Sequence, residues 1–376
     1  MSDSILTSEP SRSTLLDGAP ASDPTSVKDE RKGRVTIKDV AKVAGVHFTT
    51  VSLALRGHPS IPATTREYIR AAADRLGYIP NPVFSALTHF HLHGRVRAEP
   101  PRIAYLINHS LESGAVLYRH QEAFLEGARA QARILGYDVD MLSVSDGCYD
   151  SRGLERHLKS KGILGIIIAA FEPGFATLSL NWENYAVVKI NSLHMEPHAP
   201  VVGNDQRQDV RIAFRQMLAR GYKRIGLAVG RADEDGTEHR YTAGYLIEQA
   251  TVPVENRVPE LLFPYNATAS QVSALLGRWV RQHRVDAVLC NWYIIDELLE
   301  SAGLSVPGDV ACACLCLLEK TNRLAGVCPN LQMVGAKAMS LLTTLLKTGD
   351  RGVPEFASRT YVRSYWQEGE TAAPKS

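Results

Sequence analysis

The placement of apolar residues between positions 36 and 77 predicts three short helices. From 37 to 44 the apolar positions follow the i, i+3, i+4, i+7 spacing of one helical face, and Gly45 can take the left-handed turn that ends a helix. Similar inward faces follow at 51–55 and at 62–76. Three helices of this size can close one small core, with the tight turn at Gly45 joining the first two.

From residue 102 onward, strand-like apolar runs alternate with helical segments. The expected strands are 102–108, 137–144, 163–170 and 185–191 in a first series, and 224–230, 261–263, 286–290 and 310–316 in a second. The expected helices are 124–135, 154–161, 240–249, 270–282, 294–302 and 331–347. This alternation predicts two doubly wound α/β lobes, and their cleft is the expected ligand site because open α/β sheets bind ligands at the carboxyl ends of strands.

Charge is distributed unevenly along the chain. Residues 31–97 contain 11 Lys or Arg and 3 acidic residues, a net charge of +8, whereas the whole chain carries +2 and the remainder therefore −6. A helix, tight turn, helix unit suits either the DNA major groove or a helical bundle that contacts other proteins. The segregated positive charge favours DNA, because it is typical of a phosphate-binding head on an acidic body.

The first 33 residues are rich in Ser, Pro, Asp and Thr, show no apolar periodicity and are expected to be disordered. They lack the continuous apolar segment of a signal peptide. The longest apolar run, 163–171, is far shorter than the roughly 20 residues that span a bilayer. We therefore expect a cytoplasmic protein that has no membrane partner.

The stretch VTIKDVAKVAGVHFTTVSLALRGH, continued by TTREYIRAAADRLGYIPN, carries a family resemblance. Its T-x-x-D-V-A-x-x-A-G-V opening, T-V-S step, T-R-E helix and G-Y-x-P-N ending resemble the DNA-binding head of the LacI/GalR family of bacterial transcriptional regulators. The resemblance implies a multi-domain protein. Its all-α, lambda-repressor-like helix-turn-helix head is joined by a hinge helix to a two-lobed periplasmic-binding-protein-like core. It also implies a homodimeric regulator, most often a repressor, on a double-stranded DNA operator.

The resemblance gives a division of the chain into four parts. We expect a tail at 1–33, the head at 34–80, a hinge helix and linker at 81–101, and the effector-binding and dimerisation core at 102–376. Within the core, lobe one is expected at 102–220 and 318–346, and lobe two at 222–316 and 347–366.

In the head, the resemblance implies that Phe48, Thr49 and Leu53 read bases. Many members have Arg where this chain has Leu53, which offers only apolar contact and predicts a different operator. At Leu87 the family inserts a leucine into the minor groove, although the residue could instead belong to a core. The other DNA-binding candidates, of which most fall where the family contacts phosphates, are Thr36, His47, Thr50, Ser52, Arg56 and Asn81.

In the core the resemblance is weaker, and it implies a small-molecule effector, most plausibly a sugar. Asp205 of the GND step matches the acid that lines the family's effector pocket, although an Asp before a helix is often only its cap. Arg240 stands one residue earlier than the family's pocket arginine. Asn291 and Trp292 replace its Asn-Asp pair, and Trp292 can stack on a sugar or fill core.

Two other clusters raise the question of a metal. His89, His91 and His93 alternate and would converge only on an extended segment, and the Cys residues at 312, 314 and 316 alternate within an expected strand, where buried thiols are the commoner outcome. We expect neither a metal site nor a cofactor. A secreted solute-binding protein and an enzyme on the two lobes are the alternatives; the first leaves the basic head unexplained, and the second lacks a recognisable catalytic motif.

Overall fold

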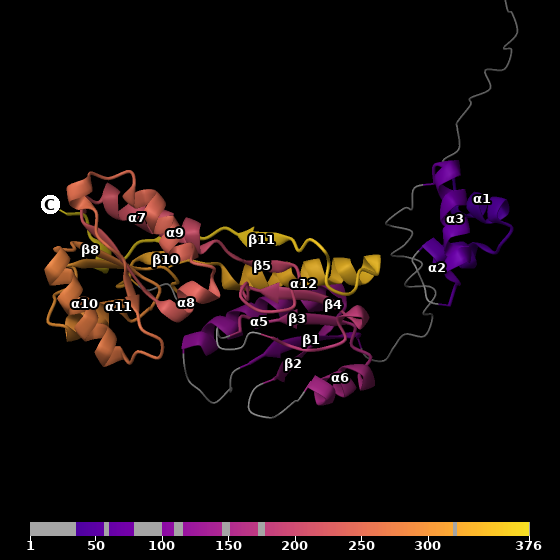
Figure 1. Ribbon diagram of the computed structural model, residues 1–376, viewed down its shortest axis with the longest axis horizontal. Coiled ribbons are helices and arrows are strands. Elements are labelled where there is room, and N and C mark those ends of the chain that lie inside the picture. The colour runs from indigo at the N-terminus through magenta and orange to yellow at the C-terminus, as the bar shows by residue number, and fades with distance from the viewer. Residues whose placement is uncertain are drawn as a thin grey trace, which may run out of the picture. The chain divides into compact units, whose positions relative to one another are not determined.

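A computed structural model describes residues 35–55, 60–78, 100–108, 116–144, 151–171, 177–318 and 322–375 (Figure 1). The chain divides into two compact units, Met1–Leu92 and His93–Ser376. The tail expected at 1–33 and nearly all of the hinge expected at 81–101 lie outside the described ranges, so those expectations stay predictions.

The N-terminal unit contains three helices that contact one another: α1 (Ile37–Ala44), α2 (Phe48–Leu55) and α3 (Ala63–Leu76). Each turns its apolar face inward, as the spacing predicts. The buried residues of this small core are Val40, Ala41, Ala44, Val51, Ala54, Ile69, Ala72 and Ala73.

Helix ends in this unit follow from local chemistry. The backbone N–H and the hydroxyl of Thr36 donate to the Asp39 carboxylate at 2.8 and 2.6 Å, which fixes the start of α1 and lowers the pKa of Asp39. Gly45 (φ +68°) and Gly77 (φ +66°) end α1 and α3 in the left-handed conformation. The turn between α1 and α2 is therefore tight, as expected.

Lobe one of the C-terminal unit is a parallel sheet of order β11-β5-β4-β3-β1-β2. Its strands are β1 (Arg102–Ile107), β2 (Asp138–Ser143), β3 (Gly165–Ile168), β4 (Ala186–Ile190), β5 (Val201–Asn204) and β11 (Arg359–Val362). Its helices are α5 (Val116–Leu135), α6 (Ser151–Ser160), the short η1 (Trp182–Asn184) and α12 (Leu331–Thr348). Figure 1 shows α12 running along this sheet, where it contacts β3, β4 and β5.

Lobe two is a sheet of order β12-β10-β9-β8-β6-β7, parallel except that β12 runs antiparallel to β10. Its strands are β6 (Ile225–Gly230), β7 (Leu261–Phe263), β8 (Ala287–Cys290), β9 (Ala311–Cys314), β10 (Gly326–Cys328) and β12 (Tyr365–Gln367). Its helices are α7 (Gln206–Ala219), α8 (Arg231–Gly236), α9 (Arg240–Gln249), α10 (Ala269–His283), α11 (Ile295–Ser301) and the short η2 (Val254–Asn256) and η3 (Glu370–Ala372).

The chain crosses between the lobes three times, and the crossings differ from the predicted boundaries. They lie between β5 and α7, between β10 and α12, and between β11 and β12. Lobe one was expected to continue to 220, but α7 packs on α9 and on the lobe-two strands β8, β10 and β12. The expected second segments are only partly right. Segment 318–346 includes α12 of lobe one but also β10 of lobe two, and segment 347–366 includes part of β12 of lobe two but also β11 of lobe one.

Helices α5 and α12 approach each other very closely. A Cβ atom added at Gly335 of α12 would lie 1.9 Å from the Phe124 carbonyl oxygen, and one at Gly127 of α5 would lie 1.8 Å from that of Gln332. Only hydrogen atoms fit between the two backbones at these points. The two glycines therefore set the distance between the helices.

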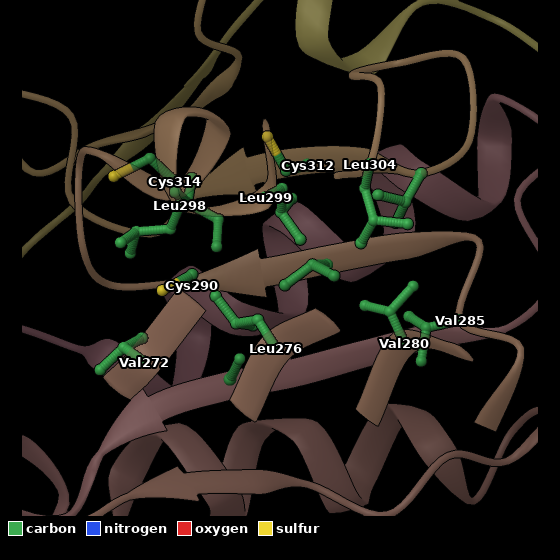
Figure 2. Packing of buried hydrophobic residues seen from close by; sticks show 14 of the residues in the cluster. Val272, Leu276, Val280, Val285, Cys290, Leu298, Leu299, Leu304, Cys312 and Cys314 are labelled. Carbon is green, nitrogen blue, oxygen red and sulfur yellow. The ribbon is translucent and has the colours of Figure 1, made fainter. Parts of the chain in front are cut away.

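The apolar core of lobe two contains four of the cysteines, of which Figure 2 labels Cys290, Cys312 and Cys314; the fourth is Cys328. Cys290 of β8 and Cys312 and Cys314 of β9 are fully buried among Leu and Val side chains, including Leu276 of α10. Burial raises the pKa of these thiols. Cys312 and Cys314 thus fill core, the outcome expected for alternating cysteines in a strand.

The longest apolar run of the sequence, 163–171, forms the completely buried strand β3 and the turn that follows it. Within the described ranges, none of the helices combines the length and the apolar character needed to cross a membrane. The strands β5, β10, β11 and β12 were not expected from the apolar pattern.

Candidate functional site

Helix α2 turns one face outward in the head. Val51 and Ala54 are buried in the head core, whereas Phe48, at 41% exposure, stands out into solvent. Thr49 and Leu53 are half-buried next to it on the outward side. Neither Phe48 nor Leu53 belongs to the described apolar core of this unit, and an exposed Phe with a half-exposed Leu on one helix suits contact with another molecule.

His47 organises the start of α2. Its carbonyl oxygen accepts the backbone N–H groups of Thr50 and Val51 at 2.9 and 3.2 Å. Its ring nitrogen Nδ1 lies 2.8 Å from the Thr49 hydroxyl, and the ring centroid is 4.3 Å from that of Phe48. His47 therefore caps the start of α2 and contacts two predicted base-reading side chains, Phe48 and Thr49.

The other DNA-binding candidates divide into two groups. Thr50 and Ser52 are half-buried on α2, and Thr36 is exposed at the start of α1 with its hydroxyl donating to Asp39. Arg56, Asn81 and Leu87 lie outside the described residues, as do the three alternating histidines at 89, 91 and 93.

A cavity of about 550 Å³ opens in the C-terminal unit, where the strands of both sheets end. Lobe one contributes residues that follow β3 and β4 and residues of α5 and α12, and lobe two contributes residues that follow β6, β8 and β9. This is the position expected for a ligand in paired open sheets, and the volume suits a small molecule. The principal polar lining residues are His120, Asn191, Ser192, His194, Asn204, Gln206, Asp209, Asp233, Thr237, Tyr241 and Asn291.

Two of the four predicted effector residues line this cavity. Asn291 and Trp292 directly follow β8 and reach it together, and the Trp292 ring packs edge-on against Phe263 with a centroid separation of 5.3 Å. Trp292 thus both fills core and faces the cavity.

Asp205 and Arg240 lie next to the cavity and pair with each other. Arg240 Nη1 donates to Asp205 Oδ1 at 3.4 Å, and the Arg240 guanidinium lies over the Tyr361 ring at 5.1 Å. Asp205 also pairs with Arg207 at 3.2 Å. Their sequence neighbours Asn204, Gln206 and Tyr241 line the cavity, but neither member of the pair is among the lining residues.

Two acidic residues of the cavity were not predicted from the sequence. Asp209 is 3% exposed on α7, and burial raises its pKa to about 7 against a hydrogen bond from Ser364. Burial also raises the pKa of Asp233 on α8, although the side chains of Asn291 and Trp292 hydrogen-bond its carboxylate. The signal for Asp209 was a polar residue on the inward face of a helix, four residues after Asp205.

Cys316 differs from the other two cysteines of its alternating set, because it lines the cavity. His120 Nε2 of α5 lies 3.0 Å from its Sγ atom, a contact that joins the two lobes. Burial raises the pKa of the Cys316 thiol well above its usual value, which disfavours the thiolate form. Among the described residues, no group of three or more His, Cys, Asp or Glu could hold a metal ion.

Together, a helix-turn-helix head and a two-lobed core with a cavity at its strand ends define a ligand-responsive DNA-binding protein. Two family models match the chain: "Bacterial regulatory proteins, lacI family" over residues 36–81, and "Periplasmic binding proteins and sugar binding domain of LacI family" over residues 120–291. They cover more than half of the sequence. The chain belongs to the LacI/GalR family of bacterial transcriptional regulators.

Curated relatives agree with this assignment. The HTH-type transcriptional regulator reg1 of Streptomyces lividans is 25% identical over 73% of this chain and 78% of its own length. Catabolite control protein A of Priestia megaterium is 24% identical over 88% of this chain and 98% of its own. These relatives are transcriptional regulators and not enzymes, so the enzyme alternative is excluded.

Solved structures share the fold. A complex of the transcriptional regulator CelR with cellobiose superposes with a TM-score of 0.54 at 17% identity, covering 90% of this chain and 100% of that one. The lac repressor dimer bound to operator and an anti-inducer superposes with a TM-score of 0.51 at 16% identity, covering 90% and 99%. The expected two-part architecture is thereby confirmed.

Proposed function

We propose that this regulator is a cytoplasmic homodimeric repressor whose operator affinity is controlled by a small polyhydroxylated molecule in the cavity between its lobes. The observation that carries the proposal is the cavity: it is lined by polar side chains from the strand ends of both lobes, so a ligand there contacts both. A ligand that binds one relative orientation of the lobes better than another shifts the equilibrium between the two orientations.

On the DNA, Phe48, Thr49 and Leu53 are the proposed base-reading residues. The exposure of Phe48 and the ordering of Thr49 by His47 support this role. The proposed contacts outside base reading come from Thr36, His47, Thr50, Ser52, Arg56 and Asn81, with Leu87 as the minor-groove wedge. A homodimer presents two heads to two half-sites, so the expected operator is a near-palindrome.

In the cavity, Asn291 and Trp292 are the proposed direct ligand contacts. Asp205 and Arg240 act from beside the cavity, where their ion pair holds the ends of α7 and α9 together. The related CelR was solved with cellobiose, and a family member from Enterococcus faecium, with a TM-score of 0.53, with ribose. The volume of the cavity accommodates a ligand of this range.

The experiment that tests this function uses the full chain. Binding sites are selected from a random DNA pool, and affinity for the selected site is measured with and without each member of a sugar panel. We expect a near-palindromic site, affinity that falls steeply with salt, and at least one sugar that changes affinity about fivefold or more.

Two results decide the matter. Phe48→Ala should abolish selection, while Tyr68→Ala, which removes an even more exposed aromatic ring from α3, should leave it intact. If Phe48→Ala selects the same site with unchanged affinity, the proposed base-reading role of α2 is overturned. If no small molecule alters DNA binding, the proposed control by an effector is overturned.

A further inference from the structure

The cavity between the lobes holds two carboxyl groups and, among its described lining residues, no Lys or Arg. Asp209 enters from α7 and Asp233 from α8. The guanidinium of Arg240, next to the lining residue Tyr241 in sequence, is directed to Asp205 and to the Tyr361 ring, and that of Arg207, next to Gln206, also pairs with Asp205. The described part of the cavity therefore holds two acidic side chains and, apart from His120 and His194, none that can carry a positive charge.

The described hydrogen-bond partners of the two acids are neutral. Asp209 accepts a hydrogen bond from the Ser364 hydroxyl, and Asp233 from the amide of Asn291 and the indole of Trp292. These donors orient the carboxylates but do not neutralise them. A buried carboxylate without a cation is costly to ionise, and the raised pKa values of both acids express that cost.

Further polar atoms of the cavity also lack partners. Gln206, which is 8% exposed at the start of α7, has its Oε1 atom buried without a donor, and the same holds for Oδ1 of Asn291. Both ring nitrogens of His194 are likewise buried without a partner. The two amide oxygens and the two carboxylates are acceptors that point to a ligand rich in donors.

We propose that the ligand of this cavity carries a protonated amino group and is an amino sugar or a polyhydroxylated amine of similar size. This inference rests on the proposed function, whose effector site it narrows. An ammonium group supplies three donors and one positive charge. It therefore both hydrogen-bonds a carboxylate and neutralises its charge, whereas a hydroxyl only hydrogen-bonds it. The sugar ring then lies against the aromatic wall formed by Trp292 and Tyr241, and its hydroxyls donate to Gln206 and Asn291.

A neutral sugar would leave this cavity incompletely matched. Its hydroxyls could donate to both carboxylates, yet the two negative charges would stay buried together after the ligand had displaced water. Binding would then require that a carboxyl group take up a proton. An amine avoids this requirement. A direct comparison of binding affinities can therefore distinguish amines from neutral sugars.

The test compares matched sugars on the full chain by thermal shift and calorimetry at pH 7.5. The probes are D-glucosamine, D-galactosamine and D-mannosamine, each beside its parent hexose and its N-acetyl derivative. The parent keeps the ring and replaces the amine by a hydroxyl, and the N-acetyl form keeps the nitrogen without the charge. We expect at least one of the three amino sugars to bind tenfold or more tightly than both its parent hexose and its N-acetyl derivative.

Two substitutions connect that preference to the cavity. Asp209→Asn and Asp233→Asn keep side-chain volume and should each reduce the preference for the amine at least fivefold. Asp235→Asn, on the same helix as Asp233 but outside the cavity lining, should leave it unchanged. Unliganded melting curves of the variants verify that each is folded.

The inference is overturned if no amine binds, if a parent hexose binds as tightly as its amine, or if both cavity variants keep the preference. A neutral sugar that binds and alters operator affinity would overturn this inference alone and leave the proposed function standing. If neither sugars nor amines alter operator affinity, the proposed function itself fails.

Discussion

Asn204 Nδ2 donates a hydrogen bond to the Pro329 carbonyl oxygen and thereby joins two of the three segments that cross between the lobes. The same amide lies 3.4 Å from the Val362 carbonyl oxygen, at the end of β11 in the third crossing. Asn204 is only 4% exposed and is the last residue of β5, where the first crossing begins. The Asn204 side chain therefore contacts all three of the segments that cross between the lobes.

Asn204→Ala should lower the free energy of unfolding of the C-terminal unit by about 1 to 3 kcal/mol, because buried carbonyl oxygens lose their donor. Asn181→Ala, which removes an exposed amide of the same unit, should change stability by less than about 0.5 kcal/mol. Chemical denaturation of both variants measures the difference. Equal stabilities would show that the amide does not hold the crossings together.

The ion pair of Asp205 and Arg240 should be measurable by a double-mutant cycle. Asp205→Asn, Arg240→Gln and the double variant are compared by denaturation, and we expect a coupling energy of about 1 kcal/mol for this half-buried pair. Because neither residue lines the cavity, Asp205→Asn should weaken ligand binding less than Asp209→Asn. The reverse order would restore Asp205 as the principal ligand contact.

Leu53→Arg should change the sequence preference of the head. Replacing an apolar side chain on the outward side of α2 with a guanidinium favours guanine at one position of each half-site, with a discrimination of about 1 to 3 kcal/mol. Thr50→Ala, at a proposed phosphate contact, should instead weaken binding alike on all sequences. Selection from a random pool with each variant tests both. Identical half-sites for wild type and Leu53→Arg would mean that Leu53 does not read bases.

The buried carboxyl of Asp209 should make stability depend on pH. Its pKa is about 7 in the folded chain and near the ordinary 3.8 when unfolded, so between these values the folded state binds more protons. The free energy of unfolding therefore falls as the pH rises from about 4 to 7, by an amount on the order of a few kcal/mol. Asp209→Asn should flatten this decline and stabilise the unliganded protein at pH 8, whereas Asp235→Asn should keep the wild-type slope. Melting temperatures across this pH range provide the measurement.

Gly335→Ala should destabilise lobe one by about 2 to 4 kcal/mol, since the new methyl group would overlap the Phe124 carbonyl oxygen and push α5 from α12. Lys337→Ala, on the exposed side of the same helix, serves as control and should be near neutral. Differential scanning calorimetry of the two variants distinguishes a packing effect from a change in helix propensity. A Gly335→Ala protein as stable as wild type would show that the helices can separate freely.

The sequence predicts the head and most central strands well, because burial gives the head helices a regular spacing of apolar residues and gives the central strands continuous apolar runs. Strands β11 and β12 were missed for a physical reason: they lie at sheet edges, are three or four residues long, and carry exposed residues such as Arg359 and Tyr365. Lobe membership failed at α7, since an amphipathic helix has the same pattern on either sheet.

The cavity could be only half predicted for a similar reason. Asn291 and Trp292 directly follow a strand, so the rule that ligands bind at strand ends finds them. Asp209 and Asp233 sit on helices and do not directly follow a strand, so this rule does not find them. The positions of Asp205 and Arg240 depend on a mutual pairing that no spacing along the chain reveals.

The three crossings also determine when the C-terminal unit can be completed during synthesis. Neither lobe is a continuous stretch of sequence, because β11 closes one sheet and β12 the other, and both lie within the last twenty residues described. Domains fold as their chain emerges from the ribosome, but here each sheet waits for its final strand. The head, in contrast, is complete once residue 76 has been made. A nascent chain would thus acquire its DNA-binding fold long before it acquires the unit that regulates it.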